Sequence, residues 1–350
     1  MAKAKEIDHL DCRASVTSGV LLVLRTRLEE LCQFRAAALD WSSVEGVHDM
    51  RVASRRLRSA LRDFKPYLRR KRMRRASQLL KRVADALGAV RDEDVAILAL
   101  EELKGDAPQE IADGIEYLLT ERTTRREQAR AGLAEAISEG ACARLQGEFI
   151  YSLERAAKIV PGITEAEEAD AGAVAYMGFH HAGREVIAGS LHELQSLSAS
   201  LYRPFETEPL HRMRIAGKRL RYAIELFMQC WGEPLVPFAK EVAEMQSHLG
   251  ELHDCDEWIA ALGARLGAEQ VEPDREIREE KRRALIWLLR SFVKARTKHY
   301  CAALERYAEW EATEFAANLM AILDREPESI EPAPATLPAA EPEAIDLQNV

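Results

Sequence analysis

Long hydrophobic runs are missing from this sequence. Its apolar stretches, such as residues 20–24, are far shorter than the roughly 20 residues that a membrane-spanning helix needs. The opening residues, Met-Ala-Lys-Ala-Lys-Glu, are not followed by the apolar segment of a secretion signal. We therefore expect a cytoplasmic protein that has no membrane partner.

Cysteine is scarce and widely spaced. No Cys-x-x-Cys pair occurs among the six residues, which are Cys12, Cys32, Cys142, Cys230, Cys255 and Cys301. Zinc knuckles and small disulfide scaffolds bring their cysteines close together in sequence, so this spacing predicts neither. We expect the six cysteines to be buried free thiols.

The alternation of apolar and polar residues that marks β-strands is also missing, and there is no Asn-Gly hairpin turn. Neither phosphate-binding loop, G-x-x-x-x-G-K-[ST] or G-x-G-x-x-G, is present. Apolar residues instead recur every three or four positions in residues 16–38, 50–64 and 79–87. This pattern predicts an all-α protein.

Composition suggests where the helical part ends. Five prolines and several acidic residues fill residues 326–350, a composition that cannot bury enough apolar surface to order itself. We expect a disordered acidic tail there. Pro161 and Gly162 mark a break between two halves, which predicts one helical bundle over residues 1–160 and a second over residues 161–325.

The two halves repeat each other. Residues 47–58 read Val-His-Asp-Met-Arg-Val-Ala-Ser-Arg-Arg-Leu-Arg, and residues 210–221 read Leu-His-Arg-Met-Arg-Ile-Ala-Gly-Lys-Arg-Leu-Arg. A second motif follows in each half: Leu-Gly-Ala-Val-Arg-Asp-Glu-Asp at residues 87–94 and Leu-Gly-Glu-Leu-His-Asp-Cys-Asp at residues 249–256. The conserved order predicts an internal duplication.

Charge is distributed unevenly. The net charge is −9, yet residues 47–91 contain fifteen Lys or Arg against three Asp, a local balance of about +12. On a helix, the basic residues of the first repeat form one stripe opposite the apolar face. We name two basic stripes: the first is His48, Arg51, Arg55, Arg58 and Arg62, and the second is His211, Arg214, Lys218 and Arg221.

Like charges three or four residues apart on a helix repel each other. A linear polyanion along the stripes would replace that repulsion with attraction, and guanidinium groups bind phosphate oxygens through two parallel hydrogen bonds. The first stripe is about 21 Å long, which favours a polymer over one phosphate. Lys81 and Arg126 are candidates to widen the surface, whereas residues 69–75 surround a helix on all sides and must be partly solvated.

An alternative is that the stripe arginines form ordinary ion pairs with acidic residues on neighbouring helices. The candidate partners are Glu29, Glu30, Glu116 and Glu121. The occurrence of the same pattern twice favours anion binding.

The doubled His-x-Met-Arg-[Val/Ile]-Ala-x-[Arg/Lys]-Arg-Leu-Arg segment, followed each time by Leu-Gly-x-x-[Arg/His]-Asp-x-Asp, resembles the CHAD family, the conserved histidine α-helical domain. The resemblance covers about residues 14–321. It implies two pseudo-symmetric four-helix bundles with a basic surface that binds inorganic polyphosphate, and association with polyphosphate granules and their proteins. The residues that match the motif are His48, Arg51, Arg55, Arg58, His211, Arg214, Lys218 and Arg221.

This sequence departs from the family in ways that bear on activity. It contains no Glu-x-Glu-x-Lys strand of the triphosphatase domain that many relatives carry, so the resemblance does not imply hydrolysis. His48 and His211 have no neighbouring ligand at metal-binding spacing. Asp92 and Asp254 follow Leu-Gly pairs, where we expect one helix to end, and are interpreted as N-caps of the next helix.

We therefore expect a non-enzymatic protein with no catalytic residues, metal or cofactor. Two alternatives remain. A nucleic-acid-binding protein would need exposed aromatic platforms, but aromatic residues make up only 6% of the chain. A phosphohydrolase or phosphoryl-transfer enzyme would use His48 or His211, but the sequence shows no partnered base beside either one.

Overall fold

A computed structural model describes residues 5, 7–156, 178–268 and 275–326 of the chain. They form helices without any β-strand, apart from one isolated bridge between Ser15 and Gly178. This confirms the predicted all-α class. The predicted junction at residues 161–162 and the acidic tail after residue 326 lie outside the described residues, and the domain boundaries and internal duplication stay predictions.

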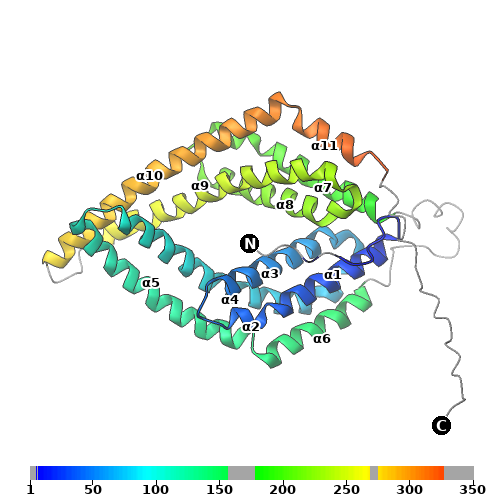
Figure 1. The fold of residues 1–350 in the computed structure, drawn as a ribbon, viewed down its shortest axis with the longest axis horizontal. Coiled ribbons are helices and arrows are strands. Elements are labelled where there is room, and N and C mark those ends of the chain that lie inside the picture. The colour runs from blue at the N-terminus through cyan, green and yellow to red at the C-terminus, as the bar shows by residue number, and fades with distance from the viewer. Residues whose placement is uncertain (1–4, 6, 157–177, 269–274, 327–350) are drawn as a thin grey trace, which may run out of the picture.

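The helices form two groups (Figure 1). The first contains α1 (Val16–Gln33), α2 (Arg35–Ala38), α3 (Glu45–Asp63), the 3-10 turn η1 (Lys65–Tyr67), α4 (Arg70–Gly105), α5 (Gln109–Ala136) and α6 (Glu139–Ala156). The second contains α7 (Phe179–Ser196), η3 (Ser198–Tyr202), α8 (Thr207–Trp231), η4 (Glu233–Leu235), α9 (Val236–Ala268), α10 (Arg275–Ala312) and α11 (Phe315–Leu323). None of the described helices combines the length and the apolar composition that crossing a bilayer needs.

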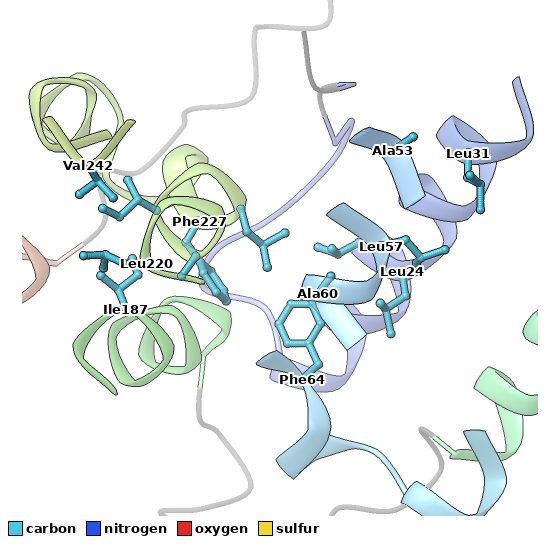
Figure 2. Packing of buried hydrophobic residues seen from close by; sticks show 14 of the residues in the cluster. Leu24, Leu31, Ala53, Leu57, Ala60, Phe64, Ile187, Leu220, Phe227 and Val242 are labelled. Carbon is cyan, nitrogen blue, oxygen red and sulfur yellow. The ribbon is translucent and has the colours of Figure 1, made fainter. Parts of the chain in front are cut away.

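Three phenylalanines join the two groups at one end. The rings of Phe64, Phe179 and Phe227 are fully buried, and their centroids lie 4.9–5.9 Å apart. Figure 2 shows Phe64 on the α3 side and Phe227 on the α8 side turned toward each other. A Cβ at Gly19 would lie 2.2 Å from the Phe179 ring. Glycine is therefore required there for the rings to meet.

The N-terminal segment crosses from the first group to the second. The backbone N–H of Phe179 donates to the carbonyl of Ala14, and Cys12 is bonded to Cys230 with Cα atoms 5.4 Å apart. The prediction of six buried free thiols is therefore wrong for this pair, and it is wrong for Cys301, which is free but exposed. Because 218 residues separate Cys12 and Cys230, their spacing in the sequence gives no indication of this bond. Because disulfides are rare in reducing compartments, this bond does not support the expected cytoplasmic location, which stays a prediction.

A second apolar contact joins the two groups at the opposite end. The far ends of α4 and α5 meet those of α9 and α10, where Trp258 stacks on Phe292 with centroids 4.9 Å apart. The buried members of this cluster are Ile97, Leu100, Ile115, Leu119, Cys255, Leu262, Ala284, Leu285, Leu288 and Phe292. Between the two contacts, α3 and α4 face α8 and α9 across the middle of the molecule (Figure 1).

Candidate anion-binding site

Helices α3 and α8 carry the basic stripes as predicted. On α3, Met50, Ala53 and Leu57 are buried in the core, so the polar side of this amphipathic helix faces away from its own bundle. On α8 the same role falls to Met213 and Leu220. The two helices contact each other, and this contact brings residues that are about 160 positions apart in sequence onto one surface.

Arg55 lies at the centre of this surface and reaches from α3 to α8. Its guanidinium carbon lies 5.3 Å from the ring centroid of Tyr222, a cation–π arrangement. Burial lowers the pKa of Arg55, and the positive charges of Arg51, Arg221 and Arg214 lower it further. The stripes are therefore close enough to act on each other electrostatically.

Among the cations of the two stripes, Lys218 has the pKa that is shifted furthest from its ordinary value. Burial lowers the pKa of its ammonium group to about 7, and Arg214 and Arg55 contribute by repulsion. Within the described part of the chain, no ion pair joins Lys218 to an acidic side chain. Burial also lowers the pKa of Arg214. The Nε atoms of Arg55 and Arg214 are buried without a hydrogen-bond acceptor among the described residues. The site is thus short of negative charge.

The second motif packs against the first motif in each half. Arg51 pairs with Asp92 at 3.4 Å, and Arg214 pairs with Asp254 at 3.5 Å. The prediction that these aspartates are N-caps is wrong, because α4 and α9 run through the Leu-Gly pairs without ending. The Leu-Gly pairs predict a helix end, but both glycines lie inside helices, where a Cβ would lie 3.5 Å from Arg51 at Gly88 and 4.0 Å from Arg214 at Gly250.

Gly88 provides a test of this packing. A Cβ at this position would lie 3.5 Å from Nη1 of Arg51, an ordinary contact. We expect Gly88→Ala to leave anion binding unchanged and to raise the free energy of unfolding by about 0.5–1 kcal/mol, because alanine is the better helix former. Gly88→Leu is expected to displace Arg51 from Asp92 and to weaken anion binding. Denaturant unfolding and a binding titration check both; equal affinities for the two variants would contradict the packing argument.

At the outer ends of the two stripes, ion pairs neutralise the arginine charges more fully than at the centre. Arg62 pairs with Asp63 at 2.7 Å, and Arg221 pairs with Glu225 at 2.6 Å. Arg58 is exposed on α3. The predicted accessory residues differ: Lys81 is exposed on α4, whereas Arg126 on α5 lies 3.9 Å from Asp94 and 3.6 Å from Glu127. Arg126 is therefore balanced by acidic neighbours.

The four glutamates considered as alternative partners bind other cations. Glu29 pairs with Lys5, and Glu30 with Arg27 and Arg56. Glu116 pairs with Lys104, and Glu121 with Arg125 and Arg265. The acidic side chains that do pair with the stripes are Asp92, Asp254, Asp63 and Glu225. Ordinary ion pairing thus explains part of the stripes, but not Arg55 or Lys218.

The two motif histidines have different neighbours. His211 lies against His253, with their Nδ1 atoms 3.1 Å apart. His48 has Arg91 at the equivalent position, and burial together with Arg91 lowers the pKa of His48. Burial, Arg214 and His211 lower the pKa of His253. His253 and Tyr222 are site residues that sequence analysis did not select. Among the described residues, no group of three His, Cys, Asp or Glu side chains could hold a metal ion.

Fold and site together define a helical protein in which two groups of helices present their cations on one shared surface. The chain belongs to the CHAD family, since the CHAD domain model matches residues 22–263. It is similar in fold to the crystal structure of the CHAD domain from the plant Ricinus communis, with a TM-score of 0.59 and 22% identity over 92% of this chain and 97% of that one.

The chain is also similar in fold to PptA from Streptomyces chartreusis. The TM-score is 0.56, and the identity is 17% over 84% of this chain and all (100%) of that one. No curated protein matches the sequence. At these identities the two structures establish the fold alone.

Proposed function

We propose that this protein binds inorganic polyphosphate along the surface between α3 and α8, without catalysing a reaction. The observation that carries the proposal is the pairing of Arg55 and Lys218. Both cations are largely buried, Arg55 lowers the pKa of Lys218, Arg214 lowers the pKa of both, and neither forms an ion pair with an acidic side chain among the described residues. Such a cluster lacks a counterion, and a chain of phosphates supplies one at regular intervals.

Membership of the CHAD family supports the same ligand. We extend the proposal to association with polyphosphate granules in the cytoplasm. The histidines fit a binding role: each lies beside another basic group, Arg91 for His48 and His253 for His211, and an imidazole can donate a hydrogen bond to phosphate.

The nucleic-acid alternative finds less support. The aromatic ring in contact with the first stripe is that of Tyr222, which is 7% exposed and covered by Arg55. Single-strand binding proteins stack bases on accessible rings, and this ring is not accessible.

A titration with polyphosphate of defined length at two salt concentrations tests the proposal. Displacement of counterions from at least six contacts is expected to lower the affinity by about two to three orders of magnitude between about 50 and 200 mM salt. Single-stranded RNA at equal charge concentration is the competitor. Equal displacement by RNA would favour the nucleic-acid alternative, and release of orthophosphate that depends on His48 or His211 would favour an enzyme.

A further inference from the structure

His211 on α8 and His253 on α9 form a pair of imidazoles that has no equivalent in the first half. Their Nδ1 atoms lie 3.1 Å apart and their ring centroids 4.2 Å apart. The residues at the matching positions of the first half are His48 and Arg91. The first half therefore has a guanidinium, which is always charged, where the second half has an imidazole that can gain or lose a proton. We name the pair the His211–His253 dyad.

The short distance between the two Nδ1 atoms limits the number of protons that the dyad can hold. At 3.1 Å one Nδ1 donates its hydrogen to the other. In the neutral dyad the donating ring then has no hydrogen on Nε2, whereas the accepting ring carries one there. One added proton binds to the bare Nε2 and leaves the contact intact. A second added proton would set two N–H groups against each other and force the rings apart.

The Nε2 atoms are the part of the dyad that can meet a ligand. Both rings are half-buried, and no hydrogen bond joins either Nε2 atom to the described residues. The neutral dyad presents one N–H group and one lone pair, and a lone pair repels a phosphate oxygen. The singly protonated dyad presents two N–H donors and a positive charge, which together suit a chain of phosphates.

The surroundings favour the neutral form of the dyad as long as no anion is bound. Burial, Arg214 and His211 lower the pKa of His253. Asp254 and Glu257 oppose this change with smaller effects, and Asp254 is itself paired with Arg214 at 3.5 Å. The other charged groups on the neighbouring segments are Glu208 one turn before His211, Arg51 on α3, which acts on Arg214, and Arg296 on α10, which is paired with Asp256. A polyanion at the Nε2 atoms would stabilise the charged form instead.

We propose that the His211–His253 dyad takes up one proton when polyphosphate binds, so that the second half gains the charge that Arg91 gives to the first half at every pH. This inference rests on the proposed function and adds a proton-dependent contact to it. The bound state then holds more protons than the free state. Polyphosphate affinity therefore rises as the pH falls from about 7.5 to about 5.5.

Two exchanges of residues between the halves test the proposal on the full chain. His253→Arg gives the second half the arrangement of the first and breaks the dyad. Arg91→His gives the first half the arrangement of the second and creates a further dyad with His48. The matched control is His192→Gln, which removes an exposed histidine of α7, elsewhere in the second half. Circular dichroism checks the fold of each variant.

Each protein is titrated with a long polyphosphate at about pH 5.5 and about pH 7.5, because only the end phosphates of a long chain titrate near about pH 6. Between the two pH values, we expect the affinity of the unmodified protein to rise about three- to tenfold more than that of His253→Arg. The affinity of Arg91→His should rise by about the same factor more than that of the unmodified protein. His192→Gln should follow the unmodified protein.

Calorimetric titration in two buffers of different ionisation enthalpy counts the protons directly. At about pH 6.5 the unmodified protein should take up more protons per bound protein than His253→Arg, by up to about one. Equal proton uptake in these two proteins, or the same pH profile in all four, would overturn the role of the dyad. If the unmodified protein binds no polyphosphate at either pH, the proposed function itself fails, and the two failures are thereby distinguished.

Discussion

Replacing Arg55 and Lys218 together by methionine is expected to weaken polyphosphate binding by at least about 100-fold while leaving the fold as stable or more stable. Each charge-assisted contact contributes about 1.5–3 kcal/mol, and 3 kcal/mol corresponds to more than a 100-fold change in affinity. Methionine keeps the unbranched stem that packs beside Tyr222 and removes a buried cation that has no acidic partner among the described residues. Loss of binding and gain of stability therefore go together.

Calorimetric titration and thermal unfolding measure the two effects. Lys71→Met/Arg82→Met is the matched control, since it removes one lysine and one arginine from exposed positions of α4. Its affinity is expected to change by less than about threefold, because both side chains are exposed and solvent and salt screen exposed charges more than buried ones. Similar losses in the two double variants would mean that net charge alone governs binding, and would remove Arg55 and Lys218 from the site.

Polyphosphate affinity is expected to fall as the pH rises above about 7, by up to about tenfold per pH unit, and Lys218 is the cause. Its pKa of about 7 is lowered from the ordinary 10.5 mainly by burial. A bound polyanion stabilises the charged form and raises this pKa, so binding takes up a proton. Lys218→Arg stays charged over the whole range and should make the affinity nearly independent of pH between about pH 7 and 9.

The same residue predicts a pH effect on the free protein. Because the pKa of Lys218 is lower in the folded than in the unfolded state, the unfolded chain holds more protons between about pH 7 and 10.5. The free energy of unfolding therefore rises with pH across this window, in the direction opposite to polyphosphate affinity. His48 and His253 titrate below the ordinary 6.5, outside the window. A flat stability profile for Lys218→Arg beside a rising one for the unmodified protein would support the assignment; identical profiles would contradict it.

Helical periodicity predicted the elements that carry the site. The apolar residues Met50 and Leu57 are buried, and α3 and α8 start where Glu45 and Glu208 favour a helix N-terminus. Periodicity also separated the basic side of each helix from its core side. It describes one helix at a time, however, and contains no information on which stripe residues meet across the two halves. The contact of Arg55 with Tyr222 could not be predicted from it.

Two predictions were wrong for the same reason: the N-cap role of Asp92 and Asp254, and the free thiols of Cys12 and Cys230. The local pattern at Gly88 and Asp92 predicts a helix end and its cap, whereas both residues lie against Arg51 of the neighbouring helix. Cys12 and Cys230 are joined through a crossing of the N-terminal segment that no local pattern predicts. In both cases the contact joins residues distant in sequence. The repeat of the two motifs was the available indication for Asp92 and Asp254, because their order is the same in both halves.

The apolar contacts at the two ends of the molecule make folding and ligand binding interdependent. Phe64 and Phe227 at one end, and Trp258 and Phe292 at the other, hold the two groups of helices together, and in doing so they force like charges into proximity. An unfolded chain has no such concentration of cations and is a poorer ligand for a polyanion. A polymer that binds the folded form alone stabilises it in proportion to the logarithm of its own concentration. On the proposed function, polyphosphate would thus raise the free energy of unfolding of this protein, and by more at higher polymer concentration.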